Sequence, residues 1–247
     1  MPAIPCARSR STIDLGRPAR RSPAGNRQNL DPAAIRLSVR GAGSDFGGAI
    51  ELKNGLLTAL AAACFLLPPA RAEWRPVEKI VTYAVSGKTG IDLYRSIGEN
   101  GPKVGVGRVI AYTDFDLKWS RDYRPRSGGC VLASAKPFLT ITYRLPKVSG
   151  ELPPGVERLW EAFAAGVEKH ERVHGEIILD MVKKIEAVSV GLTVPDDPDC
   201  KKIRQVLTKK LGELSQEQRR KSREFDRKEM SDGGNVHQLV LRLVNGG

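Results

Sequence analysis

The sequence predicts an α+β protein, with a small antiparallel sheet and one short helix followed by two long C-terminal helices. Between residues 79 and 145, several runs show the alternation of apolar and polar residues that half-buried strands have. From residue 155 to residue 230, apolar residues recur three and four positions apart, as in amphipathic helices. Strands that all precede the long helices favour an α+β fold over a repeated strand–helix–strand arrangement.

The first 72 residues carry the features of a targeting region. Residues 1–50 are rich in Arg, Pro, Gly, Ser and Ala, so we expect them to be disordered. Residues 51–72 contain Lys53, an apolar run and then Ala70-Arg71-Ala72, which are the three parts of a secretory signal peptide. The run has about 12 residues, whereas a membrane-spanning helix needs about 20. A buried core helix is the alternative interpretation.

A signal peptide normally lies at the N-terminus, so its late position indicates that translation begins near residue 50. We expect one mature domain over residues 73–247, periplasmic or secreted, that meets the membrane only through its signal peptide. Export implies an oxidising compartment. Two cysteines remain after residue 72 and allow one pairing, so we predict a Cys130–Cys200 disulfide; two buried free thiols are the alternative.

The first half of the domain contains the predicted sheet. Residues 79–85, KIVTYAV, are rich in strand-forming residue types. Residues 86–103 place apolar side chains at helical spacing and end in Gly and Pro, which predicts a short helix. Residues 108–120 alternate, with Thr113 on the apolar face, and predict a half-buried strand. A turn and two further strands are expected over residues 121–129, 130–133 and 137–145.

Two long helices are predicted over residues 155–190 and 198–230. The first has an apolar stripe of Trp160, Phe163, Val167, Ile177 or Ile178, Met181, Ile185 and Val188. The second is more highly charged, with a stripe of Ile203, Val206, Leu207, Leu211 and Leu214. Its basic run, residues 217–228, is more typical of a solvated helix face than of a binding patch.

The gap in the first stripe is filled by His170 and His174, two of the three histidines of the chain. Side chains four residues apart share one helix face, where two imidazoles can reach a zinc ion at about 2.0–2.1 Å. Two buried imidazoles need partners, because each ring presents a donor and an acceptor. Glu171 completes the HExxH pattern and is in position to be the general base for a zinc-activated water. A core helix with two hydrogen-bonded histidines and a surface glutamate is the alternative.

A catalytic zinc usually has three protein ligands and a water. If the third ligand followed shortly after His174 in the chain, it would be Asp180. That arrangement needs a glycine to break the helix at position 177, where this chain has Ile177. The helix therefore continues, the Asp180 side chain points away from His170 and His174, and we exclude Asp180 as a ligand. A ligand that follows the first long helix remains possible. The candidates are Asp226, Glu229, Asp232 and His237. Each of these also fits an ordinary surface or tail position.

The domain resembles a family of secreted bacterial proteins, originally described as a domain of unknown function, whose members are predicted HExxH zinc-dependent proteases. The resembling stretches are YAVSGKTGIDLYRSIGENGP, AYTDFDLKW, GGCVLASAKPFLTITYRLP, LWEAFAAGVEKHERVHGEI and DDPDCKKI, over most of residues 80–230. The resemblance implies His170 and His174 as ligands and Glu171 as the base, and it fits a Cys130–Cys200 bridge.

One stretch departs from the pattern of this family. Near the C-terminus we expect Tyr-Asp followed shortly by His-Gly, whereas this chain has FDRKEMSDGGNVH. Phe225-Asp226 matches the first part, and Ser231-Asp232 stands where the histidine would be. Asp226 is therefore favoured as the third ligand, since it is what remains of the motif.

These observations predict a secreted or periplasmic zinc-dependent hydrolase, and within that class a metallopeptidase that holds a peptide or protein along an exposed strand edge. A non-catalytic envelope protein with a degenerate or structural metal site is the alternative. We expect no nucleic-acid partner. The net charge is +12, but the first 72 residues hold 10 basic and 4 acidic residues. The remaining 30 basic and 24 acidic residues are too diffuse for a basic face with stacking aromatics.

Overall fold

The structure is a computed structural model that describes residues 11–13 and 74–246. These residues belong to one compact unit. Most of the segment predicted to be disordered, residues 1–50, and all of the predicted signal peptide, residues 51–72, lie outside the described residues. Within the first of these segments, Ser11–Ile13 forms a short strand, β1. Among the helices that the structure describes, none is long and apolar enough to cross a membrane.

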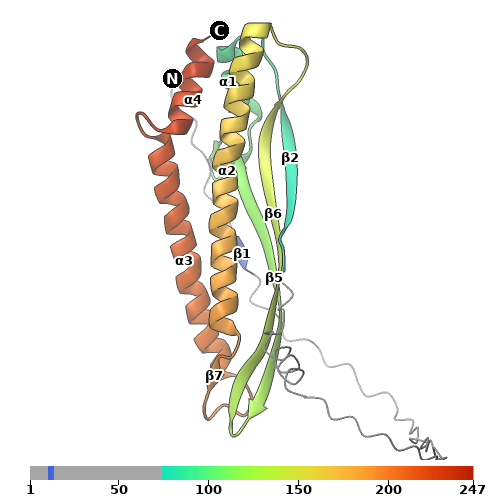
Figure 1. Ribbon diagram of the computed structural model, residues 1–247, viewed down its shortest axis with the longest axis vertical. Coiled ribbons are helices and arrows are strands. Elements are labelled where there is room, and N and C mark those ends of the chain that lie inside the picture. Colours follow the sequence, from blue (N-terminus) through green and yellow to red (C-terminus); the bar gives the residue numbers. More distant parts are fainter. Residues whose placement is uncertain (1–10, 14–73, 247) are drawn as a thin grey trace, which may run out of the picture. The chain divides into compact units, whose positions relative to one another are not determined.

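The predicted α+β architecture is confirmed, because a small sheet with a short helix precedes the long helices (Figure 1). The main sheet has the order β1-β5-β6-β2, and β7 pairs with β6. Its strands after β1 are β2 (Val77–Val85), β5 (Tyr112–Arg126), β6 (Gly129–Val148) and β7 (Thr193–Val194). A small second sheet joins β3 (Lys103–Val104) to β4 (Gly107–Arg108). The helices are α1 (Gly90–Asn100), α2 (Pro154–Ser189), α3 (Lys202–Met230) and α4 (Asn235–Asn245).

The main sheet is mixed, whereas a wholly antiparallel sheet was expected. β5 and β6 form an antiparallel hairpin, but β2 pairs with β6 in parallel and β1 pairs with β5 in parallel. The alternation of side chains shows which face of a strand is buried and carries no information on the direction of its neighbour. Between β2 and β6 the chain passes through α1 and then β5. Because β5 runs antiparallel to β6, the chain has reversed its direction again when it enters β6, and β6 therefore runs in the same direction as β2.

The hairpin differs from the expected turn at 121–129. β5 continues to Arg126 and β6 restarts at Gly129, so the loop consists of Ser127 and Gly128. Both loop residues have positive φ, 50° and 79°, as the type I′ turn that suits a two-residue hairpin requires. The expected break between 130–133 and 137–145 is also wrong, because β6 is continuous. At Pro137, β6 pairs with β5 but not yet with β2, and a proline is tolerated where a strand has a free side.

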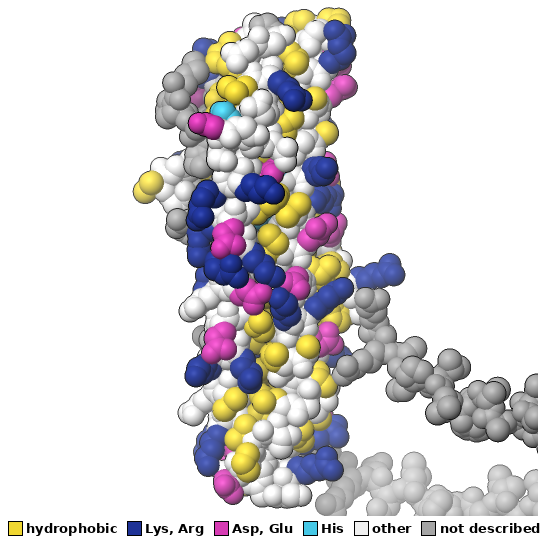
Figure 2. All heavy atoms as spheres, turned by 60° about the vertical axis from the view of Figure 1, so that its left-hand side comes forward, with side chains coloured by type: hydrophobic (Ala, Val, Ile, Leu, Met, Phe, Trp, Pro, Cys, Tyr) yellow, Lys and Arg dark blue, Asp and Glu magenta, His cyan; other side chains and the backbone are white. Residues whose placement is uncertain are grey.

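Helix α2 lies between the sheet and the two helices that follow it, α3 and α4. One side of α2 packs on β6 and β5, and the other packs on α3 and α4 (Figure 1). Its predicted stripe is buried except for Val188, which is only partly buried, and Ile178 rather than Ile177 is the fully buried member. The side on which α3 lies has basic and acidic side chains interspersed along it, as expected of a solvated helix face (Figure 2).

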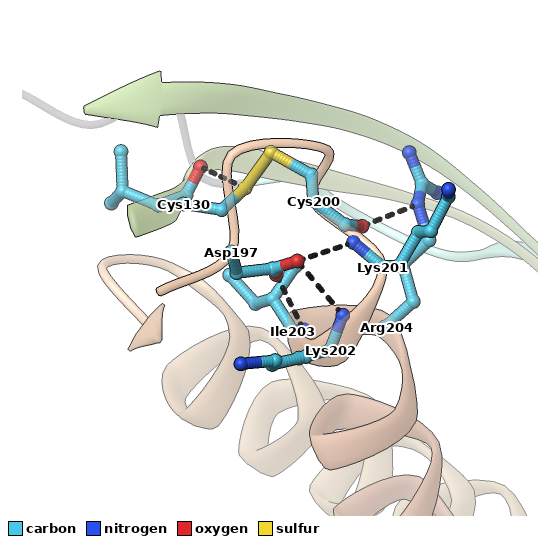
Figure 3. The surroundings of a disulfide bond; sticks show 8 residues. Cys130, Asp197, Cys200, Lys201, Lys202, Ile203 and Arg204 are labelled. Carbon is cyan, nitrogen blue, oxygen red and sulfur yellow. Dashed lines mark hydrogen bonds between the residues drawn. A yellow bond between two sulfur atoms is a disulfide. The ribbon is translucent and has the colours of Figure 1, made fainter. Parts of the chain in front are cut away.

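The start of α3 is tied to the far end of the hairpin. Cys130 of β6 and Cys200 form the expected disulfide. Beside the disulfide, the Asp197 carboxylate accepts hydrogen bonds from the backbone N–H groups of Lys201, Lys202 and Ile203, which open the helix (Figure 3). These N–H groups have no partner within the helix, so Asp197 caps it. The bridge and the cap together fix where α3 begins along α2.

Candidate metal centre

The middle of α2 carries the two histidines and the glutamate of the HExxH pattern. The residues before and after them on the stripe, Val167 and Ile178, are fully buried, so the helical register turns this face into the protein. His170 and His174 are each 2 % exposed and Glu171 is 1 % exposed. The interpretation of a surface glutamate is therefore wrong, because all three side chains are buried.

Three ligand-type atoms from two helices converge at this point. Nε2 of His170 lies 3.2 Å from Nε2 of His174. Oδ1 of Asp226, which comes from α3, lies 2.9 Å from Nε2 of His174 and 3.3 Å from Nε2 of His170. Atoms about 2.0–2.1 Å from a tetrahedral zinc ion lie about 3.3–3.4 Å from one another. The three atoms would hold a zinc ion after a slight expansion, and two imidazoles with one carboxylate are a ligand set that zinc accepts.

The electrostatics of the group favour a positive charge between the three atoms. Burial opposes protonation of His174, but the hydrogen bond and the negative charge of Asp226 outweigh it and raise the pKa of the imidazole. Burial acts to raise the pKa of Asp226, but hydrogen bonds from His170 and His174 outweigh it and lower the pKa of the carboxyl. A divalent cation would supply that charge to all three atoms at once, so the residues fit a metal ion.

Phe225 covers the histidine pair from α3. Its ring stacks on His170 with a centroid distance of 4.7 Å and an interplanar angle of 21°. It meets His174 edge-on at 5.5 Å and 79°. Because Phe225 and Asp226 are neighbours in the chain, one turn of α3 supplies both the apolar cover and the carboxylate.

Glu171 points from α2 toward the sheet. Its Oε2 accepts a hydrogen bond of 2.6 Å from the hydroxyl of Thr113 on β5, while its Oε1 has no hydrogen-bond partner among the described residues. Burial raises the pKa of Glu171, although the positive charge of His174 and the Thr113 hydroxyl act against it. Thr113 thus holds the carboxyl through Oε2, and Oε1 is available to take up a proton.

The sheet side of α2 comes close to β6 at Gly175. A Cβ atom at this position would collide with Oη of Tyr143, so glycine is what allows the approach. Oη of Tyr143 donates to Oε1 of Glu78 at 3.2 Å, and burial raises the pKa of the phenol to about 12. The guanidinium of Arg172 lies over the Tyr143 ring, and its Nη1 donates a hydrogen bond of 2.6 Å to Oε2 of Glu78. These contacts fix the helix turn that bears His174 against the sheet.

The structure separates the four candidates for a third ligand. Asp226 joins the histidines, and the other three do not. Glu229 lies on the far side of the His170 ring, with Oε2 at 3.9 Å from Nδ1. Asp232 is fully exposed, with its Oδ1 4.0 Å from Nε2 of His237. Nδ1 of His237 accepts a hydrogen bond from the backbone N–H of Gly233. Both belong to the loop and helix after α3 and contribute nothing to the convergent group.

Two residues beside the histidines had no role in the sequence interpretation. Thr113 was placed only on the apolar face of its strand, and Phe225 was noted only as part of a matching motif. No short-range pattern links a strand residue to a helix residue 58 positions away, which is the separation of Thr113 and Glu171. The signal that was present was a polar residue on the buried face of a strand, since such a side chain needs a partner.

Comparison with known proteins finds a family and nothing more specific. The model of a family described as "Bacterial protein of unknown function (DUF922)" matches residues 80–234. No curated protein and no solved structure matches the chain. The bacterial family expected from the sequence is therefore found, whereas its description names neither an activity nor a cellular location.

Proposed function

The chain belongs to the DUF922 family of bacterial proteins of unknown function, and from the geometry of its site we propose that it is a zinc-dependent hydrolase and, within that class, a metallopeptidase. The observation that carries this proposal is the meeting of His170, His174 and Asp226 next to a buried carboxyl, Glu171. Three protein ligands are the number usual in catalytic zinc sites, because they leave one position for water or substrate.

The residues divide the chemistry between them. A zinc ion, when bound, polarises a substrate carbonyl and lowers the pKa of a water molecule. Oε1 of Glu171 takes the proton of the attacking water as oxygen bonds to the carbonyl carbon, and then gives it to the amine as the carbon–nitrogen bond breaks. Thr113 holds the other oxygen of Glu171 and so keeps the carboxyl in one orientation. Phe225 packs on the imidazoles and keeps water away from that side.

A peptide substrate fits the edge of the sheet beside this site. β1 pairs in parallel with Phe115–Leu117 of β5, and this stretch begins two residues after Thr113. That pairing supports the proposal, because the edge already accepts an extended backbone by strand addition. A substrate has to replace Ser11–Ile13 there. Translation from near residue 50 followed by cleavage after Ala72, as expected from the signal peptide, would leave this segment out of the mature protein and the edge free for the substrate.

We also propose that the protein works in the periplasm or outside the cell. The Cys130–Cys200 disulfide supports this location, since disulfides persist in oxidising compartments. Sequencing the N-terminus of the exported product tests it. A mature N-terminus near Glu73 agrees with export by the predicted signal, and a product that keeps residues 1–72 contradicts it.

Replacement of the base tests the proposed activity. Wild type, Glu171→Gln and Glu176→Gln are loaded with zinc and assayed on a fluorescently labelled unfolded protein. We expect Glu171→Gln to keep its zinc and to lose about 10²–10⁴-fold in rate. Glu176 is an exposed glutamate on the same helix and its variant should match wild type. Equal rates in wild type and Glu171→Gln contradict the mechanism, and zinc retained without any hydrolysis favours the non-catalytic alternative.

A further inference from the structure

Glu229 and Asn235 form a pair on the outer edge of His170. We propose that Glu229 is a positioning residue that accepts the Nδ1 proton of His170 and thereby turns Nε2 toward the metal. Oε2 of Glu229 lies 3.9 Å from Nδ1 of His170. Its other oxygen accepts a hydrogen bond of 2.8 Å from the side-chain amide of Asn235, the first residue of α4. This role presupposes the zinc site proposed above.

The need for such a partner follows from the state of His170. A neutral imidazole that binds a metal through Nε2 carries its proton on Nδ1. Nδ1 of His170 is buried and has no hydrogen-bond partner among the described residues. Histidine ligands usually give this proton to a carboxylate or a carbonyl, which fixes both the tautomer and the orientation of the ring. A contraction of less than one ångström brings Glu229 Oε2 within hydrogen-bond distance, about 2.7–3.2 Å, of this atom.

The position of Glu229 on α3 also fits this role. Asp226 and Glu229 are three residues apart and so lie on the same helix face. One turn of α3 thus places a carboxylate at Nε2 of His170 and a second carboxylate at Nδ1. Since these nitrogens lie on opposite edges of the ring, Glu229 cannot bind the same ion as Asp226. Phe225, from the same turn, stacks on the face of the ring.

Asn235 connects this arrangement to α4. Glu229 is 8 % exposed, so its carboxylate is largely withdrawn from water and needs the amide donor. α4 packs on α1, α2 and α3, and its first residue holds Glu229 in place across the short loop after α3. The orientation of one histidine therefore depends on the docking of the C-terminal helix.

Zinc affinity tests the role without any assay of activity. The dissociation constant is measured by competition with a chromophoric chelator for wild type, Glu229→Ala, Glu229→Gln, Asn235→Ala and the control Glu224→Gln. Glu224 lies on the same helix but is exposed and bound to Arg220. We expect Glu229→Ala to bind zinc about 10–100-fold more weakly, as found for such partners of metal-bound histidines. Glu229→Gln and Asn235→Ala should lose less, and Glu224→Gln should equal wild type.

The protonation of His170 is read directly in the zinc-loaded wild type. Nitrogen-15 NMR should show a proton on Nδ1 of His170 that exchanges slowly with water, and faster exchange in Glu229→Gln. This measurement on wild type also covers the case in which Glu229→Ala does not fold. A proton on Nε2, or an affinity of folded Glu229→Ala within about twofold of wild type, overturns the role. If the wild type binds no zinc, the proposed function fails first and the role of Glu229 falls with it.

Discussion

Oδ1 of Asp226 lies 2.9 Å from Nε2 of His174, across the contact between α3 and α2. The two residues are 52 positions apart in the chain, and each belongs to a different helix. Their meeting depends on how α3 is placed along α2. Replacing Asp226 on α3 therefore tests the third metal ligand separately from the two histidines on α2.

We expect Asp226→Ala to bind zinc about 100-fold more weakly or worse, because the loss of a direct ligand exceeds the 10–100-fold typical of an outer partner. Asp232→Ala and His237→Ala should bind zinc as wild type does, since neither residue joins the convergent group. Isothermal titration of the metal-free proteins measures all three. Normal affinity in Asp226→Ala together with weak binding in His237→Ala would assign the third ligand to the histidine.

Zinc binding should weaken as the pH falls, because a protonated imidazole cannot bind the metal. The pKa of His174 is raised above its ordinary value of 6.5 by Asp226, against the effect of burial. Protons should therefore begin to compete with zinc for the His174 imidazole at a pH above 6.5. In Asp226→Asn burial acts without the carboxylate, so the pKa of His174 should fall. NMR titration of the metal-free proteins measures both values, and an unchanged pKa in Asp226→Asn would contradict this explanation.

The Cys130–Cys200 disulfide closes a loop with a sequence separation of 70 residues. A loop of this length gives about 4 kcal/mol of stabilisation when the entropy of the unfolded chain is restricted. We expect Cys130→Ser with Cys200→Ser to lose about that much in the free energy of unfolding by urea. In the presence of a thiol reductant, wild type and the double variant should be equally stable. A loss below about 1 kcal/mol would show that the bridge contributes little.

Asp197 should make the stability depend on pH at acidic values. Burial acts to raise the pKa of Asp197, but the N–H groups of Ile203, Lys202 and Lys201 outweigh it and lower the pKa. The stabilisation is present above the unfolded-state pKa of about 3.9 and is lost as the pH falls through the folded-state value. We expect Asp197→Ala to lower Tm by about 2–8 °C at pH 7. That difference should shrink below about pH 4, and a difference that stays constant down to pH 2 would speak against the cap.

Gly175→Ala should destabilise the protein by about 1–3 kcal/mol, because the added methyl group meets Oη of Tyr143 inside the core. Tyr143→Phe removes that oxygen and also its hydrogen bond to Glu78. The double variant should therefore be more stable than the sum of the two single losses implies. Urea unfolding of the four proteins measures the coupling. Strict additivity would mean that the backbone moves away from the clash.

Much of the helical part could be predicted from the sequence. The apolar stripe of α2 gave its register, and the register alone placed His170 and His174 on the buried face. Asp226 was favoured as the third ligand through a resemblance, since no periodicity can bring a residue of α3 to a residue of α2. The helix α4 was missed, although Val236, Leu239, Val240 and Leu243 have helical spacing and Val236 and Leu243 are buried.

The sheet was harder to predict, for two physical reasons. A strand's own sequence does not fix the direction of its partner, so the parallel pairing of β2 with β6 could not be read from it. Pro125 was placed in the expected turn at 121–129, and Pro137 was placed at the start of the expected strand 137–145. Both lie within strands, because the hairpin extends beyond the other strands and leaves one side of β5 and β6 without a ladder there.

We propose that His170, His174 and Asp226 together hold one metal ion. The most direct test is the zinc content of the folded, purified protein after equilibration with zinc and removal of the excess. We predict one zinc ion per chain in the wild type and none in the folded His170→Ala, His174→Ala double variant. A folded wild type without zinc, or a double variant that keeps the same amount as wild type, would show that these residues do not form a zinc site.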